Sequence, residues 1–138
     1  MRLILDTNVL IAALMKDSLT REILLFPGFE LLLPEYALEE ITKHRTKIAR
    51  HARLRGEEID LLLTILLESI SVVPKEEIRS HMQAAEELIG GVDPNDVPFV
   101  ALALARENDG IWSNDQAFDG IPGIRRWTTA DIKAYLHL

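Results

Sequence analysis

The sequence contains no cysteine, and this absence removes several kinds of chemistry at once. Disulfide bonds, zinc–thiolate sites and thiol nucleophiles are all excluded. No segment approaches the roughly 20 consecutive apolar residues that a membrane-spanning helix needs. The segment that begins Met1-Arg2-Leu3 also lacks the apolar core of a signal peptide. We therefore expect a soluble, cytoplasmic protein whose fold rests on packing alone.

Several familiar active-site motifs are also missing. The sequence has no G-x-S-x-G nucleophile elbow, no G-x-x-x-x-G-K-[ST] phosphate loop, no H-E-x-x-H pair and no G-x-G-x-x-G fingerprint. Serine-hydrolase and nucleotide-binding functions are therefore not indicated. No linker, repeat or low-complexity tract interrupts the 138 residues, so we expect a single domain over residues 1–138.

The net charge of −7 argues against a protein that coats nucleic acid through diffuse basic charge. Acidity does not exclude a nuclease, however, because carboxylates that hold metal ions become an electropositive site once the cations bind. One basic stretch contains no acid and is either an RNA-binding face or a solvated helix surface. Its members are Lys43, Arg45, Lys47, Arg50, Arg53 and Arg55.

Short β-like runs alternate with longer helical ones along the chain. This alternation predicts an α/β fold with a central parallel sheet and helices in the crossovers. The predicted strands are Leu3–Leu5, Glu30–Leu33, Ser71–Val73, Ile111–Ser113 and Ile124–Trp127. Pro34 is predicted to start a helix that continues to Ala52, and the apolar run 99–105 predicts a helix buried on every face.

Aspartates follow two of the predicted strands directly. Asp6 comes after the first strand, and Asp115 comes after Ile111–Ser113. Ligands of parallel α/β sheets bind beyond the carboxyl ends of the strands, so the two carboxylates are candidates to share a cation. Asp6 is alternatively an N-cap and Asp115 a turn residue. Asp119 is a weaker candidate for the rim of the site, since Asp119-Gly120 looks like an ordinary turn.

Two further acids lie on predicted helices. Asp96 opens the buried helix, where Asp96 or Asp93 is alternatively a cap that meets the helix dipole. Glu40 flanks the core side of the helix after Pro34 and is placed to face a cleft, although a surface position is the alternative. Glu39 is predicted to pair with Lys43 on the solvent side.

Taken together, four segments resemble the PIN-domain family, in their order as well as their content. They are residues 3–10 (LILDTNVL), 38–41 (LEEI), 93–103 (DPNDVPFVALA) and 112–115 (WSND). The resemblance implies a three-layer α/β/α sandwich with about five strands, and Mg²⁺- or Mn²⁺-dependent cleavage of RNA. It also implies that Asp6, Glu40, Asp96 and Asp115 are the catalytic, metal-binding acids. Small members of this family resemble VapBC-type toxins, which are usually dimers inhibited by an antitoxin protein.

Four carboxylates in one place repel one another unless cations intervene, and one or two Mg²⁺ ions with oxygen ligands resolve that conflict. Four polar residues beside the acids are expected to hydrogen-bond a ligand carboxylate, a water or the substrate phosphate. They are Thr7, Asn8, Ser113 and Asn114. A non-catalytic PIN-like module that binds RNA or protein stays open, whereas a phosphorylated receiver domain is disfavoured because Thr7-Asn8 stands where receivers place paired acids.

Overall fold

The centre of the molecule is a sheet of five parallel strands in the order β3-β2-β1-β4-β5, which confirms the predicted α/β class. A computed structural model describes residues 1–16, 18–91 and 93–138. The strands are β1 (Arg2–Leu5), β2 (Glu30–Pro34), β3 (Ile70–Val73), β4 (Ile111–Trp112) and β5 (Arg126–Trp127). Each lies within about two residues of its predicted position. The first strand has neighbours on both sides, so β1 and β4 end beside each other.

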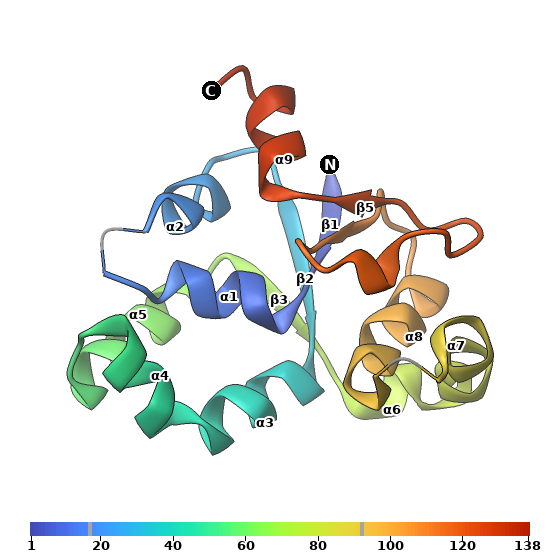
Figure 1. The fold of residues 1–138 in the computed structure, drawn as a ribbon, viewed down its shortest axis with the longest axis horizontal. Coiled ribbons are helices and arrows are strands. Elements are labelled where there is room, and N and C mark those ends of the chain that lie inside the picture. Colours follow the sequence, from blue (N-terminus) through green and yellow to red (C-terminus); the bar gives the residue numbers. More distant parts are fainter. Residues whose placement is uncertain (17, 92) are drawn as a thin grey trace.

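Helices cover both faces of the sheet, which gives the three-layer α/β/α arrangement (Figure 1). On one side lie α1 (Thr7–Ala13), α2 (Leu19–Leu24), α4 (Arg45–Ala52) and α5 (Gly56–Leu67). On the other side lie α6 (Lys75–Ile78), α7 (Met82–Ile89) and α8 (Val97–Ala105). Two further α-helices are α3 (Glu35–Lys43), which follows β2, and α9 (Thr129–Tyr135). Three short 3₁₀ helices are η1 (Arg79–His81), η2 (Pro94–Asp96) and η3 (Gln116–Phe118). No helix of the described ranges is both long and apolar enough to cross a membrane.

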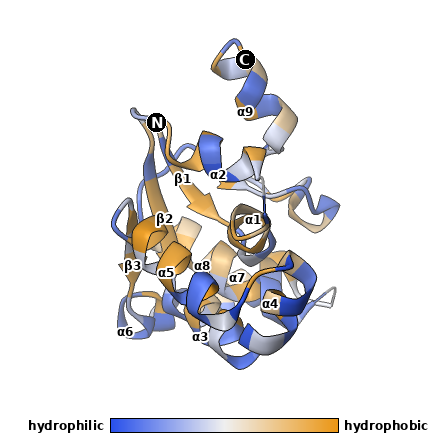
Figure 2. Ribbon diagram, turned by 90° about the vertical axis from the view of Figure 1, so that its left-hand side faces the viewer, coloured by the Kyte–Doolittle hydropathy of each residue, from blue (hydrophilic) through white to orange (hydrophobic). Residues whose placement is uncertain are grey.

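The core lies between the sheet and these helices. Leu3–Leu5 and Leu31–Leu33 are all buried, as expected for central strands that are covered on both faces. Figure 2 shows the same layering, with apolar strands inside and hydrophilic surfaces on α3 and α4. Helix α8 is buried from Val97 to Leu102, but Leu104 is 38% exposed, so the prediction of a helix buried on every face is wrong for its last turn.

The predicted helix from Pro34 to Ala52 is interrupted, and this part of the prediction is wrong. Helix α3 ends at Lys43 and α4 starts at Arg45, with His44 between them at φ −107° and ψ 17°. After the change of direction α4 packs against α5, where Arg45 donates two hydrogen bonds of 2.7 Å to Asp60. The apolar periodicity continues across His44, which is why the sequence pattern alone does not reveal the break.

The predicted pair between Glu39 and Lys43 is also wrong. Glu39 forms its ion pair with Lys75, which belongs to α6 and is distant in the sequence. The carboxylate therefore binds α3 to the neighbouring layer. Lys43 is exposed and forms no ion pair with the described part of the chain.

Candidate metal centre

Asp6 stands at the carboxyl end of β1, in the N-cap position of α1, but its side chain does not cap that helix. Its Oδ2 instead accepts a hydrogen bond of 2.6 Å from the hydroxyl of Ser113, a fully buried residue just after β4. The Ser113 hydroxyl in turn accepts a hydrogen bond of 3.0 Å from the backbone N–H of Asp115. The pairing of β1 with β4 therefore brings Asp6 and Asp115 to one place, and Ser113 links them.

Asp96 comes from a different part of the chain and lies near enough to Asp6 and Asp115 for their charges to raise its pKa. It ends η2, is only 8% exposed, and does not cap α8 with its side chain. Asp93 instead caps the preceding 3₁₀ helix η2, where its Oδ1 accepts a hydrogen bond of 2.9 Å from the backbone N–H of Asn95. The two neighbouring aspartates therefore differ in role. The Asp93 carboxylate hydrogen-bonds the backbone of the turn, whereas the Asp96 carboxylate is available for a ligand.

Glu40 approaches from α3 and is half-buried. Its Oε1 lies 3.5 Å from the hydroxyl of Thr7, which donates a hydrogen bond across from the start of α1. Thr7 is itself buried. Glu40 therefore faces the end of β1, which is one of the two positions that the sequence left open, and is not an isolated surface glutamate.

The other candidate residues have local partners. Asp115 is exposed and accepts a hydrogen bond of 2.9 Å from the backbone N–H of Ala117, which is the turn interaction offered as its alternative role. Asn114 exchanges hydrogen bonds with Thr129 at the start of α9. Asp119 is ion-paired with Arg126 at 2.7 Å.

These differences divide the candidates. Asp115 still borders a hollow of about 310 Å³ with Asp6, Asn8 and Asn114. Asp119 does not border that hollow, and its carboxylate is occupied by Arg126. Of the acids at the end of the β4 segment, only Asp115 therefore has the position of a ligand.

Burial and the negative charges of neighbouring acids make ionisation of these carboxyl groups less favourable. Burial raises the pKa of Asp96 to about 6, with further contributions from the charges of Asp115 and Asp6. Burial also raises the pKa of Asp6, against the lowering effect of the Ser113 hydrogen bond. Burial and the charge of Asp6 raise the pKa of Glu40. A protonated carboxyl or a bound cation relieves this repulsion.

The donor set fits a hard divalent cation. All four acids supply oxygen atoms, which Mg²⁺ and Mn²⁺ prefer. The best single indication is Asp96, a buried carboxylate whose pKa is shifted by burial and by other acids but by no hydrogen-bond donor. Within residues 1–16, 18–91 and 93–138, no three Asp, Glu or His side chains stand close enough together to hold one ion as they are placed.

Sequence reasoning missed two hollows that flank Glu40. One is lined by Tyr36, Lys43 and Asn95, among others, and the other by His44, Lys47 and His51 with Thr7 and Asn8. The spacing of His44, Lys47 and His51 at one and two helical turns gave a signal for the second hollow. The first combines segments that are distant in the chain, so only the fold reveals it.

Comparison with known proteins agrees with this architecture. A family model for the PIN domain matches residues 4–137. A chain in the crystal structure of VapBC2 from Rickettsia felis bound to a DNA fragment from their promoter is similar in fold, with a TM-score of 0.67 and 18% sequence identity over 93% of this chain and 98% of that one. No curated protein sequence matches. The family model covers Asp6, Glu40, Asp96 and Asp115, and on this match the chain belongs to the PIN-domain family.

Proposed function

We propose that the protein is a Mg²⁺- or Mn²⁺-dependent ribonuclease that hydrolyses phosphodiester bonds of RNA, with residues 1–138 forming one nuclease domain. The observation that carries the proposal is the pair of buried carboxylates, Asp6 and Asp96, at the carboxyl edge of the sheet. Two such groups destabilise the fold when both are ionised. A divalent cation bound between them would offset the repulsion between the two negative charges, so this pair favours cation binding.

In this proposal the residues have distinct tasks. Asp6 and Asp96 are the central ligands, and Glu40 and Asp115 complete the site for one or two ions. A bound cation supplies activation of a water molecule and neutralisation of phosphate charge. Ser113 fixes the Asp6 carboxylate through its 2.6 Å hydrogen bond, and Thr7 positions Glu40. Asn8 is exposed at the border of the hollow, where its amide can reach a phosphate oxygen. Cleavage would leave 3′-hydroxyl and 5′-phosphate ends.

The finer proposal is that the enzyme is the cytoplasmic toxin of a VapBC-type pair and acts as a homodimer held inactive by an antitoxin protein. Its support is the fold similarity to a chain of the VapBC2 complex. A reading frame for a small DNA-binding protein beside the gene is the expected genetic context. RNA processing by a solitary nuclease is the alternative if that reading frame is absent.

The test is cleavage of a mixed pool of structured and single-stranded RNAs with Mg²⁺, Mn²⁺ or EDTA. Wild-type protein should cleave with either metal and not with EDTA, and Asp6→Asn should be inactive. Asp119→Asn is the matched control, because it removes an equal charge from a carboxylate that is paired with Arg126. No cleavage under any condition would favour a non-catalytic module that binds RNA or protein. Full activity of Asp6→Asn would contradict the assignment of the site.

A further inference from the structure

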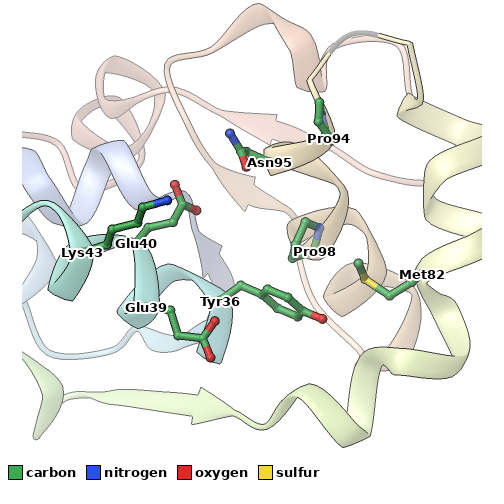
Figure 3. Close-up of a pocket in the computed structure, with 8 residues that line it drawn as sticks. All are labelled: Tyr36, Glu39, Glu40, Lys43, Met82, Pro94, Asn95 and Pro98. Atoms are coloured by element: carbon green, nitrogen blue, oxygen red, sulfur yellow. The ribbon is translucent and has the colours of Figure 1, made fainter.

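The hollow lined by Tyr36, Lys43 and Asn95 adjoins the acidic site, and Glu40 belongs to both (Figure 3). It has a volume of about 340 Å³ and lies between α3 on one side and η2 with the start of α8 on the other. Met82, at the start of α7, contributes to its lining. Any polymer that crosses the acidic site at Glu40 is therefore adjacent to this hollow.

The lining combines apolar surfaces with two polar groups of different kinds. The ring of Tyr36, the ring of Pro98 and the side chain of Met82 provide the apolar part (Figure 3). Lys43 and Asn95 provide an ammonium group and a carboxamide at the border. Flat apolar surfaces beside a cation and an amide suit a nucleotide, which presents a ring face, a hydrogen-bonding edge and a phosphate.

Two acids, Glu39 and Glu40, line the hollow together with Lys43, and neither forms an ion pair with Lys43 within the described residues. Glu40 is a proposed metal ligand, so a bound cation would offset its charge. The Glu39 carboxylate is paired with Lys75. The Lys75 ammonium additionally lies 4.7 Å from the centroid of the Tyr36 ring, which holds the ring in place from α6. Lys43 forms no ion pair in the part of the chain that the structure describes, so its charge remains available for an anionic ligand.

We propose that this hollow binds one unpaired nucleotide of the RNA, next to the bond that is cleaved at the acidic site. Tyr36 and Pro98 contact the base, Asn95 reads its edge, and Lys43 contacts the adjacent phosphate. The inference rests on the proposed ribonuclease function and adds a substrate preference to it. A base within an A-form helix is stacked and paired and cannot enter, so the nucleotide must come from a single-stranded segment or loop.

Binding of short single-stranded RNA, measured by fluorescence anisotropy, tests this site separately from catalysis. Ca²⁺ replaces Mg²⁺ in these titrations, since it also takes oxygen ligands but in a looser geometry, and a gel confirms that the RNA stays intact. Tyr36→Leu should weaken binding about tenfold, because base stacking on an aromatic ring is lost. Lys43→Gln should weaken binding and lower the salt dependence by about one phosphate contact. Asn95→Ala should reduce the differences in affinity among the four homopolymeric RNAs.

Two matched variants control for general effects. Tyr135→Leu removes a tyrosine from α9, and Lys133→Gln removes an equal charge from the same helix; neither residue lines the hollow. Both should bind RNA as the wild type does. Thermal unfolding of every variant checks that the fold is retained.

The outcomes separate the two proposals. Wild-type cleavage of RNA together with unchanged binding by Tyr36→Leu and Lys43→Gln would overturn the nucleotide site and leave the nuclease standing. Equal losses in the α9 controls would overturn it as well, since binding would then depend on overall charge. Tight RNA binding that is lost only in the hollow variants, without cleavage by the wild type, would support the site and contradict the nuclease. Failure of the wild type to bind RNA would overturn the nucleotide site.

Discussion

Two groups of aspartates lie near the carboxyl edge of the sheet, and their surroundings differ. Asp6 and Asp96 are buried, their pKa values are raised, and neither side chain caps a helix. Asp93 and Asp119 are exposed, and their carboxylates are engaged in a turn and in an ion pair with Arg126. The position of an aspartate in the sequence therefore does not show whether its carboxylate is free to bind a ligand. The partner of its carboxylate separates a candidate ligand from a structural residue.

The largest expected effect is the difference between Asp96→Asn and Asp93→Asn. The first removes a proposed ligand and should lower metal-dependent RNA cleavage by more than about 100-fold, because even residues that only support a ligand typically matter by 10–100-fold. The second preserves the turn through the asparagine oxygen and should lower cleavage by less than about threefold. Rates measured at saturating Mg²⁺ test the difference. Equal losses would mean that the two aspartates are not separated as described.

Stability of the metal-free protein should depend on pH through the buried acids. Asp96 has a pKa of about 6 in the fold against an ordinary value of 3.8. The fold therefore retains a proton that the unfolded chain releases, and this stabilisation is complete below about pH 4 and is lost as pH rises through about 6. The loss is at most about 3 kcal/mol. Urea unfolding in EDTA should show a smaller decline for Asp96→Asn than for the wild type, and added Mg²⁺ should stabilise the wild type more than Asp96→Asn at neutral pH. If the free energy of unfolding depended on pH in the same way in the two proteins, Asp96 would not be the source of the decline.

Ser113→Ala should have an intermediate effect. The substitution leaves every acid in place but removes the hydroxyl that donates to Asp6 and accepts from the Asp115 backbone. Loss of such a supporting hydrogen bond typically weakens metal affinity or activity by about 10–100-fold. Metal dependence of cleavage distinguishes the cause, since a higher Mg²⁺ requirement is expected. Ser18→Ala serves as the control, because it removes a hydroxyl that caps α2 and hydrogen-bonds the backbone of Ala12 and Arg21 but none of the acids.

The smallest effect is expected for Asp119→Asn. Its ion pair with Arg126 is exposed on the carboxylate side and should contribute less than about 1 kcal/mol to the free energy of unfolding. Cleavage should stay within about twofold of the wild type. A loss comparable to that of Asp96→Asn would place Asp119 in the site and weaken the distinction between the two groups.

Much of the fold could be predicted because its determinants are local. The strands β1 and β2 are continuous apolar runs, and the Thr128–Asp131 capping box marks the start of α9. The break at His44 could not be predicted, because it depends on contacts between α4 and α5 that include Arg45 with Asp60. The same holds for the pairing of Glu39 with Lys75 rather than Lys43.

The candidate site shows the same division between local and distant information. The positions of Asp6 and Asp115 after strands were visible in the sequence, whereas the sequence left open whether Asp93 or Asp96 is the cap. The hydrogen bond between Ser113 and Asp6 depends on the pairing of β1 with β4. The metal-binding and catalytic roles of the acids stay predictions.

Calorimetric titration of Mn²⁺ into the wild type and Asp96→Asn tests the central claim most directly. At a pH above about 7, where the Asp96 carboxyl is ionised, the wild type should bind one or two ions. Asp96→Asn should bind at least about tenfold more weakly, and Asp119→Asn should bind as the wild type does. Absence of Mn²⁺ binding by the wild type, or equal binding by Asp96→Asn, would contradict the assignment of a metal centre to the buried acids.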